Sequence, residues 1–159
     1  MGENGARSLV FLARSAQIEP GTDESVQEFH SQGLLVNGRV NNMANVQRAL
    51  NNKVTAVRPL AGVMNLSMDP RDTRLANMTF DGWQTAVEPM VRGTWNLHEA
   101  TSMNIELEFF LLFFCFPGIV GQHGQANYAA ANGFLDAFVR FRQHEDWSPL
   151  SLTSASWAK

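Results

Sequence analysis

The sequence predicts an α/β fold built on a doubly wound parallel sheet. Along the 159 residues, short apolar segments alternate with longer segments whose apolar residues recur at helical spacing. This order is typical of parallel strands joined by crossover helices. The most apolar segment, residues 109–116, is apolar on both alternations, as in a strand that is covered on both faces. The length predicts a single domain, residues 1–159.

Five segments have the length and composition of strands. Each is short and apolar, and polar residues, glycine or proline separate it from the next segment. In chain order they are residues 8–13, 34–40, 60–66, 108–114 and 150–156. The break at Pro117 and Gly118 favours a strand rather than a helix for the fourth of them.

Four longer segments have the periodicity of amphipathic helices. In chain order they are residues 22–32, 41–51, 79–100 and 125–143. Thr79 or Asp81 can cap the third helix, and Pro89 within it predicts a kink or two separate parts. The residues predicted to face the core are Val26 and Phe29; Met43, Val46, Ala49 and Leu50; Trp83, Val87, Val91, Thr94 or Trp95, and His98; and Phe134, Ala137, Phe138 and Phe141.

Composition excludes several classes of function. A net charge of −3, with twelve scattered cationic residues, argues against nucleic-acid binding. The single cysteine excludes an internal disulfide, and no Cys/His pair has zinc-ligand spacing. The longest apolar run has eight residues, against about 20 for a membrane span, and the start of the chain lacks a secretory signal. We therefore expect a cytoplasmic protein that binds no metal, membrane or nucleic acid.

The predicted topology also places a binding site. Ligands of doubly wound sheets bind beyond the carboxyl ends of the strands. The segments at the carboxyl ends of the first four predicted strands are residues 14–15, 38–40, 65–68 and 115–118. We expect these four segments to surround one crevice.

Tyr128 and Cys115 are the candidate residues for chemistry. They are the only tyrosine and cysteine, and Tyr128 lies in QANYAAAN, where little else can carry a proton. Two structural alternatives remain open: a lone tyrosine on a helix can simply pack with its hydroxyl hydrogen-bonded, and a cysteine at the end of an apolar strand can be a small buried hydrophobe. His98 and His123 do not form a triad with either residue and are predicted to be structural or solvated.

Three segments carry a family resemblance. FPGIVGQHGQANYAAANGFLDAFVRFR resembles the catalytic stretch of the ketoreductase domains of polyketide synthases, which are short-chain dehydrogenases/reductases. GVMNLSMDPRDTRLANMTFDGWQTAVEPMVRGTWNLHEAT resembles the family's fourth strand and following helix in fungal highly reducing synthases, and GARSLVFLARS resembles its second strand. The resemblance covers essentially the whole chain. It implies a truncated Rossmann-like fold that lacks the family's first strand, glycine-rich turn and C-terminal lid.

The resemblance implies NADP(H)-dependent reduction of a β-ketoacyl group on an acyl-carrier domain, in secondary metabolism and with a polyketide synthase as partner. In the family, a tyrosine protonates the developing alkoxide, a serine donates a hydrogen bond to the same oxygen, a lysine lowers the tyrosine's pKa, and an asparagine completes the set. The tyrosine and asparagine roles carry over to Tyr128 and Asn132. The serine position falls on Cys115 and the lysine position on Met90.

Met90 and Cys115 predict weakened or lost catalysis. The pKa of an unperturbed tyrosine is about 10, and a neighbouring ammonium brings such an acid towards neutral pH. Met90 carries no charge, and Arg92 lies about 200° around the helix from it. A thiol is a weak hydrogen-bond donor, so Cys115 is a poor substitute for a serine.

The resemblance also implies cofactor contacts. They fall on Arg14, Ser15, Arg39, Val40 and Asn65. Arg14 and Ser15 match the positions that hold the 2′-phosphate of NADP, and the absence of an acid there agrees with NADP rather than NAD. Arg39 replaces the family's aspartate near the adenine. Without the glycine-rich turn that approaches the pyrophosphate, we expect an incomplete cofactor site.

Three interpretations follow. The chain is either a weakened reductase, supplied in trans to a synthase, or a non-catalytic pseudo-ketoreductase that acts as a docking or structural module or is a remnant of a larger synthase. Met90 and Cys115 favour the second. The third is self-association through sheet edges left unpaired by the absent strand, since a bare FFLLFF segment is prone to pair with other chains.

Overall fold

A computed structural model describes most of the chain. The described residues are 9–14, 33–52, 54–55, 59–102, 107–114, 120–145 and 150–154. The predicted helix at residues 22–32 and the candidate residues Ser15 and Cys115 lie outside them.

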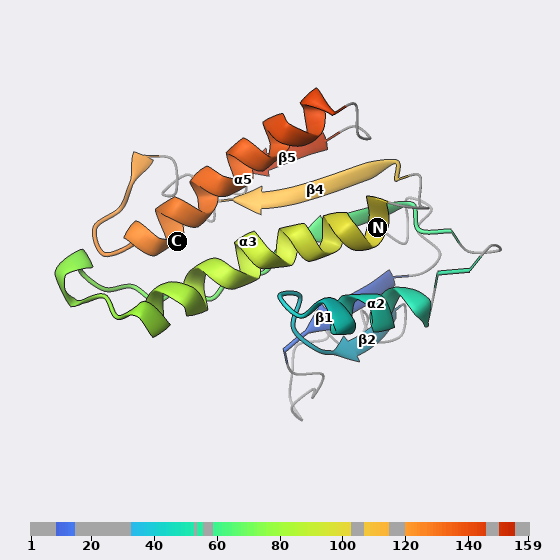
Figure 1. Cartoon of the computed structure of the whole chain (residues 1–159), viewed down its shortest axis with the longest axis horizontal. Helices are drawn as coiled ribbons and strands as arrows, with labels where there is room; N and C mark the ends of the chain where they lie inside the picture. The colour runs from blue at the N-terminus through green and yellow to red at the C-terminus, as the bar shows by residue number, and fades with distance from the viewer. Residues whose placement is uncertain are drawn as a thin grey trace.

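The strands pair in parallel, as predicted (Figure 1). They are β1 (Leu9–Ala13), β2 (Gly33–Asn37), β3 (Gly62–Asn65), β4 (Phe109–Phe114) and β5 (Leu150–Ser154). One sheet has the order β1-β2 and the other β3-β4-β5. In register, Ala13 lies opposite Asn37, and Val63 opposite Phe110.

The sheet is interrupted between β1 and β3. Within the described residues no ladder joins these two strands, so each has one neighbour. Among the described strands, this arrangement agrees with the expectation that the middle of the sheet is unpaired. Self-association through the two edges stays a prediction.

Helices hold the two sheets together. They are α2 (Met43–Asn51), α3 (Phe80–Ser102) and α5 (Ala126–His144), with a short 3-10 helix η2 (Leu75–Asn77) before α3. Figure 1 shows α3 running between the group of β1, β2 and α2 and the group of β4 and α5. It packs on α2 on one side and on α5 and β3 on the other. None of the helices in the described ranges has the length and apolarity needed to cross a membrane.

Side chains cap the starts of α2 and α3. Asn42 Oδ1 accepts hydrogen bonds from the backbone N–H groups of Ala44 and Asn45. Thr79 Oγ1 accepts one from Gly82 N at 3.1 Å, which selects Thr79 over Asp81 as the cap. The helix continues through Pro89 as one element, so the alternative of two separate helices is wrong.

The buried face of α5 differs from the predicted stripe. Of the four predicted core residues, Phe138 is buried, whereas Ala137 is exposed and Phe141 is 40% exposed. The buried positions are Asn127, Tyr128, Ala131, Asn132, Leu135, Phe138, Val139 and Arg142. The apolar ones among them belong to one cluster with the fully buried Phe110 and Leu112 of β4. The apolar periodicity missed this face because it includes two asparagines and an arginine.

In α3 the buried residues are mostly small or polar. Thr94 is fully buried, whereas Trp95 is 36% exposed, which decides between the two predicted alternatives. His98 is also buried, as predicted. In α2 the predicted stripe is confirmed, with Val46 and Ala49 buried. Small side chains on α3 allow α2 and α5 to approach it closely.

A buried arginine–histidine pair joins α3 to α5. Arg142 is 2% exposed, and its Nη1 lies 2.7 Å from His98 Nδ1. Its guanidinium carbon lies 4.5 Å from the ring centroid of Phe110. Because a guanidinium only donates, Nδ1 accepts and the ring proton of His98 is on Nε2. Burial, followed by the charge of Arg142, lowers the pKa of His98, and Glu99 opposes this shift.

Acidification is therefore expected to destabilise the fold through His98. The pKa of His98 is below the ordinary 6.5 in the folded chain, so the unfolded chain takes up the proton first as the pH falls. The neutral His98 therefore stabilises the fold above about pH 6.5, and this contribution is lost progressively below that pH. We expect the free energy of unfolding to fall between pH 7 and pH 5, by at most about 2 kcal/mol for this one group, measured by urea unfolding. His98→Asn keeps an acceptor without the titration and should flatten this dependence. The exposed His123→Asn serves as control, and identical pH profiles for all three proteins would contradict the prediction.

Candidate functional site

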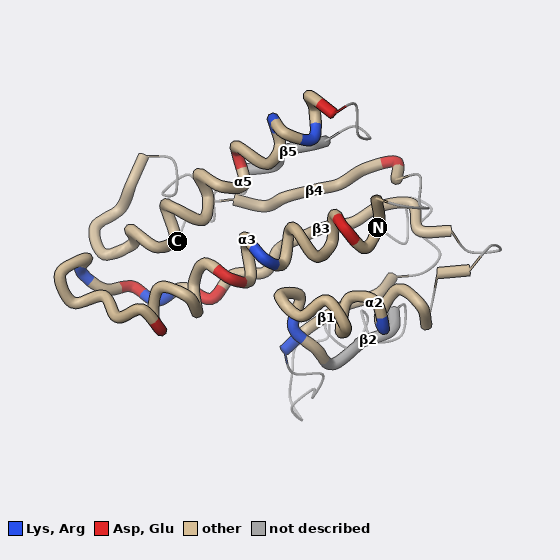
Figure 2. The backbone as a smooth tube through the Cα atoms, in the orientation of Figure 1, with Lys and Arg blue, Asp and Glu red and all other residues tan. Residues whose placement is uncertain are grey.

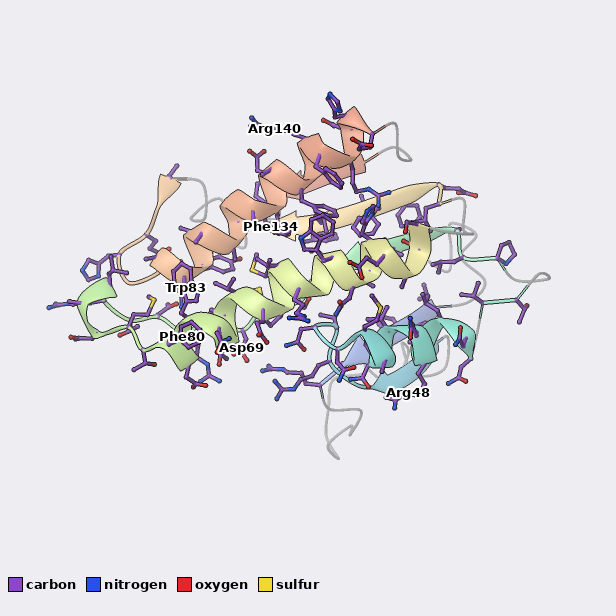
Figure 3. The ribbon with its side chains drawn as sticks, viewed as in Figure 1. Arg48, Asp69, Phe80, Trp83, Phe134 and Arg140 are labelled. Atoms are coloured by element: carbon purple, nitrogen blue, oxygen red, sulfur yellow. The ribbon has the colours of Figure 1, made fainter. Side chains whose placement is uncertain are left out.

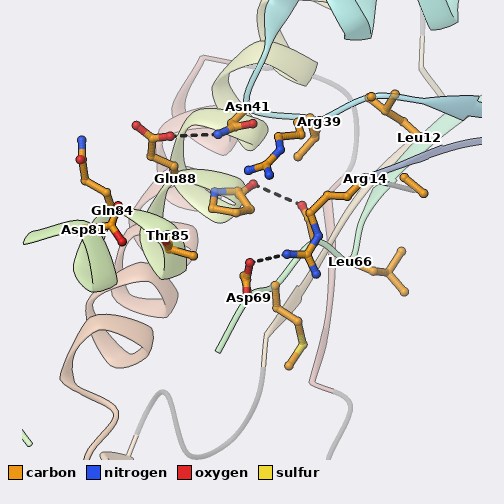
Figure 4. A pocket seen from close by; sticks show the side chains of 16 residues that line it. Leu12, Arg14, Arg39, Asn41, Leu66, Asp69, Asp81, Gln84, Thr85 and Glu88 are labelled. Carbon is orange, nitrogen blue, oxygen red and sulfur yellow. Dashed lines mark hydrogen bonds and ion pairs between the residues drawn. The ribbon is translucent and has the colours of Figure 1, made fainter. Parts of the chain in front are cut away.

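A pocket of about 380 Å³ lies at the carboxyl ends of β1, β2 and β3 (Figure 4). Its walls are residues 12–14, 38–41 and 66–69, closed by the N-terminal half of α3. Three of the four segments predicted to surround a crevice thus meet there. The fourth, residues 115–118, lies outside the described part of the chain.

The loop after β2 is anchored on α3. Asn96 Nδ2 donates a 2.8 Å hydrogen bond to the carbonyl of Val40, and Asn41 Nδ2 donates one of 2.9 Å to Glu88. A Cβ atom at Gly93 would lie 2.6 Å from Val40 Cγ1, so α3 and the loop can approach this closely only with glycine there. These contacts fix Val40 and Asn41 at the pocket wall.

The segment after β3 is anchored by Asn65. This buried side chain donates to Thr94 Oγ1 at 3.0 Å and accepts from both the backbone N–H and the hydroxyl of Ser67. Ser67 Oγ in turn donates to the carbonyl of Pro89 at 3.2 Å. Asn65 does not itself line the pocket; it positions residues 66–69, which do.

Charges of both signs line the pocket. Arg14 and Arg39 reach it from the segments after β1 and β2, and Asp69, Asp81 and Glu88 reach it from the segment after β3 and from α3. Figure 2 shows basic and acidic residues together along the N-terminal half of α3 and the loop before it. The cationic groups needed to hold a phosphate are therefore present, but acids surround them.

Among the predicted cofactor residues, the structure brings Arg14, Arg39 and Val40 into one wall. Two guanidinium groups fit the 2′-phosphate end of NADP(H), because they can donate paired hydrogen bonds to its oxygens. Within the described residues, Gly38 is the one glycine that lines the pocket, so no glycine-rich turn is present there for the pyrophosphate. In the described part of the chain, this wall therefore offers guanidinium donors for a phosphate ester and no glycine-rich turn for a pyrophosphate.

The three predicted catalytic residues that the structure describes lie in the core rather than in this pocket, and Cys115 lies outside the described residues. Tyr128 and Asn132 are on α5, Met90 is on α3, and all three are buried. Asn132 Nδ2 donates a 2.7 Å hydrogen bond to the backbone carbonyl of Tyr128. Met90 and Tyr128 belong to the same apolar cluster. Met90 directly follows Pro89, which lines the pocket, so α3 connects the two regions.

The cations near this cluster in sequence lie away from Tyr128. Arg142 follows it by fourteen residues on α5, about 21 Å along the helix axis. Arg92 is exposed on α3, whereas Met90 is 2% exposed. This orientation agrees with the expected rotation of Arg92 away from the lysine position.

Sequence reasoning missed Asn127 and Asp69. Asn127 is fully buried; its Oδ1 accepts from Tyr128 N at 2.8 Å, and its Nδ2 donates to the carbonyl of Arg71 at 3.1 Å. Asn127 thus joins the first turn of α5 to the loop after β3. Its place beside Tyr128 in QANY was the available signal. Asp69 lies one residue beyond the predicted segment 65–68, and no sequence signal pointed to it. In the described ranges, no three His, Cys, Asp or Glu residues gather to hold a metal.

Comparison with known sequences gives a consistent family. The KR domain model matches residues 1–159. A highly reducing polyketide synthase of Purpureocillium lilacinum (lcsB) is 55% identical over 148 residues, which are 91% of this chain and 6% of that protein. One from Fusarium sp (g433) is 49% identical over 145 residues, or 89% of this chain and 6% of that protein. The chain therefore spans about 6% of the length of these relatives.

Solved structures give the same fold. The ketoreductase from the first module of phoslactomycin biosynthesis in Streptomyces sp. HK803 has a TM-score of 0.78 at 26% identity, covering 95% of this chain and 35% of that one. A ketoreductase domain from the bacillaene assembly line has a TM-score of 0.79 at 24% identity, covering 94% and 37%. The doubly wound α/β architecture predicted from the sequence is therefore confirmed.

Proposed function

The chain belongs to the KR family, the ketoreductase domains of fungal highly reducing polyketide synthases, and on that premise we propose that it retains a phosphate-binding pocket and has lost most of its reductase activity. The pocket would hold the adenosine 2′-phosphate half of NADP(H), with Arg14 and Arg39 on the phosphate. When bound, the nucleotide supplies a hydride. The substrate of the reaction would be a β-ketoacyl thioester on an acyl-carrier domain.

The observation that carries this proposal is the burial of Met90 in the cluster that contains Tyr128. A phenol acts as a general acid near neutral pH when a cation beside it stabilises the phenolate. The apolar thioether of Met90 provides no such stabilisation. Tyr128 is therefore expected to pack as a core residue and to transfer no proton at a useful rate.

The proposed partner is a polyketide synthase. The relatives are large synthases of which a segment like this chain is about 6%. A domain that retains a pocket without efficient chemistry could serve such an assembly as a docking or structural module. The squalestatin hexaketide synthase of Cochliobolus lunatus, 40% identical over 138 residues, belongs to the same group of matches.

A comparison of the chain with its Tyr128→Phe variant tests the proposal. We expect both proteins to oxidise NADPH at the same rate in the presence of a small β-ketoacyl thioester, because the hydroxyl contributes nothing to the rate. The measurement is the loss of NADPH absorbance with and without thioester. A ketoreductase domain with a complete catalytic set, assayed with and without its own tyrosine, shows that the assay can detect the loss. A thioester-dependent rate that disappears in Tyr128→Phe would refute the proposal.

A further inference from the structure

A carboxylate of the chain itself lies at the cationic end of the pocket. Asp69 Oδ2 accepts a hydrogen bond from Arg14 Nη1, and Asp69 Oδ1 lies 3.5 Å from Arg71 Nε. The Asp69 side chain is 15% exposed, whereas those of Arg14 and Arg71 are 57% and 56% exposed. Asp69 is therefore held between two guanidinium groups that solvent can reach. Figure 4 shows the ion pair with Arg14 across the pocket, and Figure 3 shows Asp69 beside the N-terminal half of α3.

This ion pair joins the two halves of the interrupted sheet. Arg14 follows β1 directly, and Asp69 lies four residues after the end of β3. Both residues line the pocket, so a group that enters from solvent to bind Arg14 meets the Asp69 carboxylate. A carboxylate and a phosphate ester compete for the same guanidinium donors, and their negative charges repel each other when both lie beside Arg14.

The other acids of the pocket have different surroundings. Glu88 accepts a hydrogen bond from Asn41, and Asp81 lies in the first turn of α3. Among the described residues, Asp69 is the pocket acid that forms an ion pair with Arg14. An effect of Asp69 on ligands should therefore depend on Arg14, whereas a general effect of negative charge would be shared by Asp81.

We propose that Asp69 is an internal competitor for the phosphate ester that binds Arg14, and that it selects against ligands carrying a 2′-phosphate. This inference rests on the proposed nucleotide pocket. Asp69 weakens binding of a 2′-phosphorylated adenosine and leaves binding of an adenosine without that phosphate nearly unchanged. Asp69 thus sets how strongly the chain prefers NADP(H) over NAD(H).

Calorimetric titration of the full chain with adenosine 2′,5′-bisphosphate and with adenosine 5′-monophosphate tests the inference. We expect Asp69→Asn to bind the bisphosphate about tenfold more tightly than the parent chain and the monophosphate within about twofold. Asp69→Ala should show the same gain, which guards against an effect peculiar to one substitution. The control Asp81→Asn should change bisphosphate affinity much less, since Asp81 does not contact Arg14.

Combining Asp69→Asn with Arg14→Gln should abolish the gain. Unchanged or weaker bisphosphate binding by both Asp69 variants would overturn the inference, as would equal gains for the two ligands or no binding of the bisphosphate by any variant. The assay contains no thioester and measures no turnover. A Tyr128-dependent reductase rate would therefore refute the proposed loss of activity and leave the result for Asp69 standing.

Discussion

Turnover of a small β-ketoacyl thioester with NADPH is expected to be slower by about four orders of magnitude or more than in a ketoreductase domain with a complete catalytic set. The resemblance assigns position 90 to the family's lysine, which lowers the tyrosine's pKa, and position 115 to its serine, which donates to the developing alkoxide, and this chain has methionine and cysteine there. Removing one such donor costs about 2.7–4 kcal/mol of transition-state stabilisation, and each 1.36 kcal/mol is a factor of about ten in rate. Two losses of at least this size multiply to about 10⁴.

The measurement is kcat/KM from NADPH absorbance, with a catalytically complete ketoreductase domain as reference. A value within about tenfold of the reference would contradict the prediction, because that gap corresponds to about 1.4 kcal/mol. This experiment measures the size of the deficit, whereas the Tyr128→Phe comparison tests whether any remaining rate depends on the phenol.

Restoring the two residues is not expected to restore the rate. A lysine at position 90 would enter a site that is 2% exposed and surrounded by an apolar cluster. Burial lowers the pKa of a lysine, so the amine would be held neutral and could not stabilise a phenolate. Met90→Lys with Cys115→Ser should therefore remain near the parent rate, and Met90→Leu is the matched control for packing. A recovery of two orders of magnitude in the double variant would show that these two side chains alone limit the chemistry.

The strands and the pocket were predictable because their signals are local. An apolar run such as residues 109–114 is bounded by polar residues, glycine or proline in the sequence itself. Parallel strands place the segments that follow them at one edge, so residues 14, 38–40 and 66–68 were expected together, and the structure brings them together. The interruption of the sheet was likewise expected from the resemblance.

The burial of Arg142 and the ion pair of Asp69 were not predictable, because each depends on partners distant in the sequence. Arg142 is buried because His98 and Phe110, 44 and 32 residues before it, form its site. From the sequence alone it has the pattern of a solvent-exposed cation at a helix end, and Phe141 beside it has that of a core residue; the structure reverses the two. Asp69 was missed for the same reason, since its partner Arg14 is 55 residues away.

The second large effect is expected from Phe110→Ala, which should lower the free energy of unfolding by about 4 kcal/mol. Phe110 is fully buried near the start of β4, and its ring packs at a centroid distance of 6.3 Å from Phe138. Truncation leaves a cavity in the cluster and removes the ring from beneath the buried guanidinium of Arg142. A domain of this size has a total stability of about 5–15 kcal/mol, so this variant should be close to unfolding.

The contribution of the Phe110 ring's contact with Arg142 to the free energy of unfolding can be separated from that of its buried apolar volume. Phe110→Leu retains most of the apolar volume and removes the aromatic partner of the cation–π contact. Arg142→Met removes the charged partner of the same contact. In a double-mutant cycle of these two substitutions, followed by urea unfolding, we expect a coupling free energy of about 1–2 kcal/mol. A coupling near zero would mean that Phe110 stabilises the fold by filling volume alone. A coupling of the expected size would show that the buried Arg142 is part of the core, although the apolar pattern of α5 gives no sign of it. The charge of Arg142 is stabilised there by the Phe110 ring beneath it and by the neutral imidazole of His98 beside it.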